Sequence, residues 1–244
     1  MFHAKKGIYG SRDAFLRIVH FGADGAPILD MTEENEILPE NKNVTMTIKV
    51  EKEAEPEPPV ELPYEDVKES DWYYNAVYFN YIEKTMTGLD KTHFGPNQNL
   101  ARAQFAIILY RMNGEPKVEY KATFPDVEDN VWYTDAILWA NSIGVVTGYT
   151  DTGCFGTADR INREQMATMM YRYAEYKGYD TGMKADFSKF IDADRVNDFA
   201  DEAMQWAVGT GIITGKYNGT MLDPQGNASR VECAVIMTRF MEMY

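Results

Sequence analysis

Residues 64–244 repeat one pattern three times, and this repetition constrains the fold more than any other feature of the chain. Each copy begins with an aromatic residue, followed by an alanine four positions later and a second aromatic after three more, as at Trp132, Ala136 and Trp139. A glycine stands twelve residues beyond that alanine, and two arginines nine residues apart follow it. Each copy of about 55–60 residues should therefore be one structural unit that is stacked on its neighbours.

Each copy is predicted to form a helix, a loop and a second helix. The aromatic and alanine positions share one face of a helix with a period of 3.6 residues. The second helix shows the same period, for example at Phe105, Ile108, Leu109 and Met112. A single helical hairpin cannot bury its apolar face, whereas three around a common axis can. We therefore predict a mainly α fold for repeats 64–117, 124–178 and 187–244.

Residues 1–63 have a different character. Apolar residues alternate with polar ones over residues 44–50, which is typical of a strand with one buried face. Further strands are predicted at residues 14–21 and 26–31. Three strands are too few for an independent sheet, so we interpret residues 1–52 as the tail of a longer β-domain. Residues 53–63 contain four prolines and four glutamates, which predicts a stiff, solvated linker.

Composition excludes several classes of function. The 24 basic and 38 acidic residues give a formal charge of −14, which disfavours nucleic acid and anionic membranes as partners. No apolar run is long enough to span a bilayer, and the first residues lack an export signal. Two cysteines exclude a disulfide scaffold and a multi-cysteine zinc site, although a bridge between Cys154 and Cys233 remains open.

No catalytic, metal or cofactor motif is evident. The three histidines have neither metal-protease nor triad spacing, and no glycine-rich phosphate loop follows a strand. The acidic segment 192–198 lacks the central glycine and closing glutamate of a calcium loop, so a solvated surface is the better interpretation. We therefore expect no enzyme activity, no metal and no cofactor in these residues.

The combination of motifs in residues 64–244 resembles the S-layer homology family. The second copy carries Phe-Pro-Asp-Val at 124–127, Gly-Val-Val-Thr-Gly at 144–148 and Asn-Arg-Glu-Gln at 162–165, and the third carries Ser-Arg-Val-Glu at 229–232. The resemblance implies a pseudo-threefold trimer of helical hairpins in a secreted, cell-surface protein of Gram-positive type. It also implies non-covalent anchoring to a secondary cell-wall polysaccharide, often pyruvylated, in grooves between repeats.

The first arginine of each pair is the principal binding candidate. Asn162 with Gln165, and Ser229 with Glu232, fit the capping box that begins a helix. The arginine between them then stands in the first turn, where free N–H groups and the helix dipole favour an anion. A guanidinium can also bind a carboxylate with two hydrogen bonds. The alternative is that these arginines are surface residues or pair with nearby carboxylates. The three candidates are Arg102, Arg163 and Arg230.

Other repeated positions complete the candidate site. The tryptophans that open the first helices could be hydrophobic staples or platforms for a sugar, and the loop glycines could provide positive φ or a close backbone approach. In the family such glycines border the ligand groove. The second arginines are expected to form salt bridges between repeats, with the repeated aspartates as possible partners. The further candidates are Trp72, Trp132, Gly88, Gly148, Gly215, Asp66, Asp126 and Asp192, and the second arginines are Arg111, Arg172 and Arg239.

The three copies differ at positions that should affect how well each groove binds its ligand. The first has Lys84 where the others have glycine, and Ala101 in place of a capping side chain. The third has Phe199 in place of tryptophan. We therefore expect grooves with Arg163 and Arg230, whose caps are intact, to bind best. The competing hypotheses are a self-assembly module of a surface layer, with neighbouring surface-layer proteins as partners, and the anchor of an upstream wall-acting enzyme.

Overall fold

A computed structural model describes residues 20–21, 27–28 and 60–244, and the chain forms two compact units, Met1–Glu57 and Pro58–Tyr244. In the first unit, β1 (His20–Phe21) pairs antiparallel with β2 (Pro27–Ile28), with His20 opposite Ile28. These residues lie within two of the predicted strands. The predicted strand at 44–50 and most of the predicted linker lie outside the described residues.

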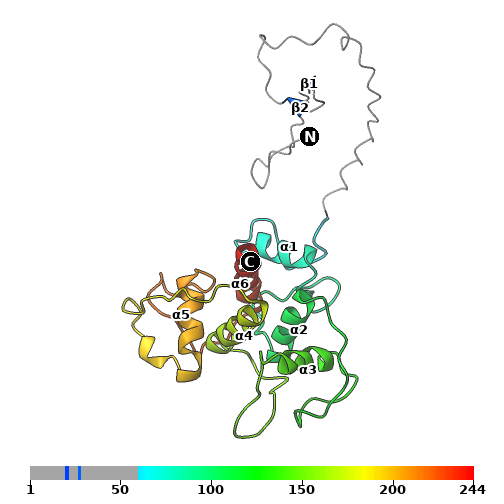
Figure 1. The fold of residues 1–244 in the computed structure, drawn as a ribbon, viewed down its shortest axis with the longest axis vertical. Helices are drawn as coiled ribbons and strands as arrows, with labels where there is room; N and C mark the ends of the chain where they lie inside the picture. The colour runs from blue at the N-terminus through cyan, green and yellow to red at the C-terminus, as the bar shows by residue number, and fades with distance from the viewer. Residues whose placement is uncertain (1–19, 22–26, 29–59) are drawn as a thin grey trace. The chain divides into compact units, whose positions relative to one another are not determined.

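The second unit is helical, as predicted, and each repeat supplies two helices (Figure 1). Short 3₁₀ turns, η2 (Ala193–Arg195) and η3 (Asp198–Ala200), precede the first helix of the third repeat. The six helices are α1 (Tyr74–Ile82), α2 (Arg102–Met112), α3 (Thr134–Ser142), α4 (Arg163–Lys177), α5 (Asp201–Gly209) and α6 (Arg230–Met243).

Helices pack across repeats, not within them. The second helix of one repeat lies against the first helix of the next, which pairs α2 with α3, α4 with α5, and α6 with α1 (Figure 1). The two helices of a single repeat do not form the packed hairpin that we expected. The physical reason is that the loop between them runs into the centre of the unit, where it meets the other two repeats.

A closed ring of backbone hydrogen bonds marks the pseudo-threefold axis. Leu100 N donates to Ala228 O at 2.9 Å, Ala228 N donates to Ile161 O at 3.0 Å, and Ile161 N donates to Leu100 O at 2.9 Å. All three residues are fully buried and lie just before the second helix of their repeat. Each repeat therefore contributes one segment to a centre that is incomplete without the other two.

A buried polar network joins the last helix to the first. The Asn80 amide on α1 donates to Ala234 O at 3.0 Å and to Thr238 Oγ1 at 2.9 Å, both on α6. Thr85 Oγ1 donates to Asn80 Oδ1 at 2.8 Å, so both ends of this amide have partners. The other two helix pairs have alanines, Ala140 and Ala207, at the position of Asn80. This hydrogen bonding is therefore specific to the pair that closes the ring.

Lys84 adopts a left-handed backbone conformation at a position where the other two repeats have glycine. Its φ is +56°, and the equivalent Gly144 and Gly211 have φ of +79° and +77°. A side chain in this left-handed region costs about 1–2 kcal/mol, whereas glycine avoids that cost. The departure noted in the first repeat is thus a site of local strain.

Replacing Lys84 with glycine should raise the free energy of unfolding by about 0.5–1 kcal/mol, because the relief of strain exceeds the entropy that glycine loses on folding. Urea unfolding followed by circular dichroism measures the change. Gly144→Ala is the matched control: nothing lies within 4 Å of the added Cβ, so only the positive φ opposes it. We expect Gly144→Ala to be destabilising, and a destabilising Lys84→Gly would contradict the strain argument.

Candidate ligand grooves between the repeats

The first arginine of each pair begins a second helix and reaches into the loop of the next repeat around the ring. The Nε atoms of Arg102, Arg163 and Arg230 donate to the carbonyls of Phe155, Leu222 and Phe94 at 3.0, 2.8 and 2.7 Å, respectively. A second donor of Arg163 reaches Thr214 O at 2.7 Å, and one of Arg230 reaches Thr87 O. These side chains are only 4–7% exposed, and burial lowers the pKa of each guanidinium. They hold neighbouring repeats together.

The first backbone N–H groups of the second helices already have acceptors, contrary to our expectation that they are free. Arg230 N donates to Gln98 O at 2.8 Å and Val231 N donates to Pro96 O at 3.1 Å, both in the first repeat. The same pattern occurs at the other two second helices, where Arg163 N bonds to Gly226 O and Arg102 N bonds to Asp159 O. Loop carbonyls of the neighbouring repeat therefore already accept hydrogen bonds from the first backbone N–H group of each second helix.

The caps of these helices follow the differences between the copies. Asn162 Oδ1 accepts a hydrogen bond from Gln165 N at 2.8 Å, and Ser229 Oγ accepts one from Glu232 N at 3.3 Å. In turn, the side-chain oxygens of Glu232 and Gln165 accept hydrogen bonds from the backbone N–H groups of Ser229 and Asn162, respectively. At α2, only one of the two capping hydrogen bonds exists, because Ala101 has no polar side chain. Ala101 N donates to Gln104 Oε1 at 3.0 Å.

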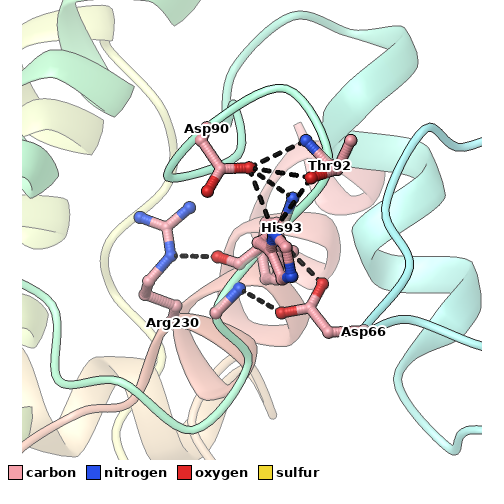
Figure 2. Close-up of polar contacts among 7 residues, drawn as sticks. Asp66, Asp90, Thr92, His93 and Arg230 are labelled. Atoms are coloured by element: carbon pink, nitrogen blue, oxygen red, sulfur yellow. Dashed lines mark hydrogen bonds and ion pairs between the residues drawn. The ribbon is translucent and has the colours of Figure 1, made fainter.

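The repeated aspartates hold their own loops. Asp66 accepts hydrogen bonds from the N–H groups of Phe94 and Gly95, both at 2.8 Å, as Figure 2 shows. Asp126 has three such donors, from Phe155, Gly156 and Thr157, and Asp192 has two, from Leu222 and Asp223. The second arginines do not pair with these aspartates. They donate instead to loop carbonyls of their own repeat, at Thr85, Val145 and Ile212.

The pKa of Asp126 lies below its ordinary value of 3.8. Burial acts to raise it, but the backbone N–H donors favour the charged form and outweigh burial. A lowered pKa in the folded state means that the stabilisation is complete above the ordinary pKa and is lost as the pH falls through the folded value.

Asp126→Asn should therefore lower the free energy of unfolding by about 1 kcal/mol at pH 7, because a neutral amide accepts these bonds less strongly. The difference from wild type should shrink as the pH falls below about 4. Urea unfolding between pH 7 and pH 3 measures it, with the exposed Asp129→Asn as control. A difference that does not depend on pH would contradict this account of the carboxylate.

An aromatic ring lies against each groove glycine. A Cβ on Gly88, Gly148 or Gly215 would come within 2.5, 2.7 or 2.8 Å of the ring of Tyr64, Phe124 or Phe190, respectively. Of the three, only Gly148 has a positive φ, at +73°. Close approach is thus the shared reason for glycine, and positive φ applies to one copy.

One cavity of about 240 Å³ brings residues of all three repeats together. We call it the Arg230 groove. Met86 to Leu89 of the first repeat line it together with Arg230 of the third and Trp132 of the second. Residues of α2, namely Gln104, Ile107, Ile108 and Arg111, complete the wall with Leu100. Its lining contains two arginines and no carboxylate.

The aromatic residues that open the first helices are exposed. Trp72, Trp132 and Phe199 are 73%, 63% and 55% exposed, whereas Trp139 and Trp206 are buried in the core. Trp132 packs edge-on against Tyr133, with ring centroids 5.1 Å apart, which leaves a face of its ring free for contact. Of the two exposed tryptophans, Trp132 is the one that lines the Arg230 groove.

A second cavity, of about 470 Å³, has the opposite character. Three aspartates line it, and its lining contains no cation. The lining residues are Asp126, Tyr149, Asp151, Thr152, Cys154, Gly156 and Asp159. An anionic ligand would be repelled here and attracted to the Arg230 groove.

A model of the S-layer homology domain matches residues 63–106, 123–167 and 189–233, which correspond to the three repeats. The chain belongs to the S-layer homology family. It is 29% identical over 72% of its length to an endoglucanase of Bacillus sp. (strain KSM-635), of which it covers 18%. It is 30% identical over 62% of its length to the surface-layer 125 kDa protein of Lysinibacillus sphaericus, covering 12%. It is 26% identical over 75% of its length to a cellulosome-anchoring protein of Acetivibrio thermocellus, covering 39%.

The S-layer homology chain thus spans less than two fifths of each of these relatives. In the described part of the chain, no helix is both long enough and apolar enough to cross a membrane. Within the same residues, no cluster of three or more metal-ligating side chains occurs. Cys154 and Cys233 are both free thiols, so the bridge that we left open does not form.

Eight of the eleven residues that line the Arg230 groove are not among the predicted ligand-binding residues, and these eight include Arg111, Leu89 and Gln104. The sequence predicts salt bridges between repeats for Arg111, yet this residue lines the groove of the S-layer homology domain, as do Leu89 and Gln104, for which the sequence predicts no ligand contact. The signal for Arg111 was present, because it recurs as regularly as Arg102. Nothing in the repeat pattern points to Leu89, since its position differs in every copy.

Proposed function

We propose that residues 60–244 anchor the protein non-covalently to the bacterial cell wall by binding an acidic wall polysaccharide in the Arg230 groove. The observation that carries the proposal is the lining of this groove: two guanidinium groups, an exposed tryptophan and no carboxylate. In a chain with a formal charge of −14, such a local excess of positive charge points to an anionic ligand.

The groove has separate groups for the two parts of an acidic sugar. Arg230 uses Nε and one terminal nitrogen for loop carbonyls, so its remaining nitrogen can donate to a carboxylate such as that of a pyruvate ketal. Arg111 is less buried and adds a second guanidinium, which is partly balanced by an ion pair with the exposed Glu115 at 3.8 Å. Trp132 offers an aromatic face for the apolar side of the sugar ring.

The relatives support a wall-associated role at the cell surface. Their names include a surface-layer protein, a cellulosome-anchoring protein and an endoglucanase, and the chain matches only a small part of each. A shared segment in proteins with such different names fits an anchoring module better than a catalytic one. We propose that the S-layer homology repeats are not themselves catalytic.

Sedimentation with purified cell walls tests the proposal. We expect the protein to pellet with walls of a Gram-positive bacterium that carries a surface layer, and to stay in solution when hydrofluoric acid has removed the wall polysaccharide. Moderate salt should weaken binding only slightly, because the contacts are short-range and partly buried. Equal binding to stripped walls would refute the proposal. Concentration-dependent oligomers that ignore polysaccharide would favour self-assembly instead.

A further inference from the structure

The residue that follows each groove glycine occupies the same place in all three repeats but differs in chemistry. These residues are Leu89, Tyr149 and Lys216. Their backbone N–H groups donate to equivalent loop carbonyls, those of His93, Cys154 and Met221, each at 2.8 Å. The same backbone geometry therefore places three different side chains beside the arginine that reaches this loop from the neighbouring repeat.

In the second repeat, Tyr149 covers the arginine. The guanidinium carbon of Arg102 lies 4.7 Å from the centre of the Tyr149 ring and 5.0 Å from that of Phe155, so two aromatic rings contact this cation. Tyr149 and Asp159 both line the acidic cavity described above. An acidic ligand would have to displace the phenol ring and approach three aspartates.

In the third repeat, Lys216 makes two ion pairs across the loop. Its Nζ lies 3.2 Å from Asp223 and 3.1 Å from Glu232. Glu232 is the third residue of α6, and its counterpart on α2 is Gln104, which lines the Arg230 groove. Lys216 thus ties the loop to the helix at the place where the first repeat is open, and it brings two carboxylates to that place.

In the first repeat, Leu89 has neither an aromatic ring to cover the arginine nor a charge to form ion pairs. Its side chain lies against Gly95, has no charge or hydrogen-bonding group, and lines the cavity of about 240 Å³. The nearby Asp90 carboxylate accepts bonds from the N–H groups of Thr92 and His93 in its own loop, as Figure 2 shows. Arg230 therefore has no competing carboxylate in the groove lining, and Arg111 has only a long ion pair with Glu115, with Nε 3.8 Å from Oε1.

We propose that the residue after the groove glycine decides which groove is open, so that this chain binds one acidic sugar unit, in the Arg230 groove. Tyr149 and Lys216 occupy the other two sites with groups of the protein itself. This inference rests on the proposed function. It also revises the ranking by helix caps, which placed Arg163 beside Arg230.

The first test exchanges these residues and measures sedimentation with purified cell walls. Leu89→Tyr should lower the affinity for walls at least tenfold, because the ring would cover Arg230 as Tyr149 covers Arg102. Ile191→Tyr, which adds the same ring at a side chain that is 76% exposed and does not line the groove, should bind as wild type does. If wild type does not pellet, the anchoring function fails and this inference fails with it. If wild type and Leu89→Tyr pellet equally, only this inference is overturned.

The second test locates binding through the four indole N–H signals in a nitrogen-15 NMR spectrum. The probe is a methyl glycoside with a 4,6-pyruvate ketal, and its uncharged ethylidene analogue is the control. In wild type, the Trp132 signal should shift and that of Trp72, at the equivalent position of the Lys216 site, should not. Lys216→Leu should make the Trp72 signal shift as well. The buried Trp139 and Trp206 report that the fold is intact. A Trp72 shift in wild type, no Trp132 shift, or an unresponsive Trp72 in Lys216→Leu would overturn the inference.

Discussion

Replacing Arg230 with methionine should lower the free energy of unfolding by about 3–4 kcal/mol. The carbonyls of Phe94 and Thr87 would lose their donor, and each buried, unsatisfied carbonyl costs about 1–3 kcal/mol. Methionine keeps much of the apolar stem, so the loss reports mainly on the hydrogen bonds and on the contact between the guanidinium and the Phe94 ring, 4.7 Å from its centre. Urea unfolding monitored by tryptophan fluorescence measures the change.

The same substitution at two other arginines provides a comparison for the loss of stability. Arg102→Met removes the donor of one carbonyl contact, to Phe155, and should lower the free energy of unfolding by about half as much. Arg111→Met removes a long contact to Thr85 O at 3.4 Å and an exposed ion pair, so it should cost less than 1 kcal/mol. A stable Arg230→Met would mean that this arginine does not hold the third repeat to the first.

Trp132→Ala should weaken binding to cell walls about 30-fold, which corresponds to about 2 kcal/mol for an aromatic residue central to a binding site. The free energy of unfolding should change little, since the side chain is 63% exposed. Sedimentation with purified walls at a series of protein concentrations measures the affinity, and urea unfolding measures the stability. The combination separates this residue from Arg230, whose loss affects the fold.

The pseudo-threefold symmetry supplies matched controls for Trp132. Phe199 occupies the same position in the third repeat and Trp72 in the first, and both are exposed. Phe199→Ala and Trp72→Ala should leave wall binding unchanged, because neither residue lines the Arg230 groove. Equal losses from all three substitutions would indicate that exposed aromatic surface, and not one groove, determines binding.

The positions of the helices could be predicted from the sequence, whereas their partners could not. The 3.6-residue period places an apolar face on each helix, and all three repeats have the same period. Because these faces are nearly equivalent, the pattern cannot distinguish packing within a repeat from packing between repeats. The pairing of α1 with α6 depends on the path of the long loops and on Asn80, whose role is visible only when α6 is placed beside it.

For the candidate site too, the sequence predicts the positions of residues but not their contacts. The recurrence of Arg102, Arg163 and Arg230 correctly located a set of equivalent residues at helix N-termini. Sequence reasoning could not show that loop carbonyls of a neighbouring repeat already occupy the backbone donors there. A repeat alignment also emphasises what the copies share. The difference between the grooves lies at Leu89, Tyr149 and Lys216, which such an alignment treats as variable positions.

The cyclic hydrogen bonds at Leu100, Ile161 and Ala228 limit how this architecture can change in evolution. In an open solenoid, a further repeat can be added at an end, because each repeat contacts only its neighbours in sequence. Here the last helix packs on the first, and every central segment has both of its partners. A fourth copy inserted by duplication would have no place at the axis. The number of repeats is therefore set by closure, and diversity can arise only by substitution within three fixed positions.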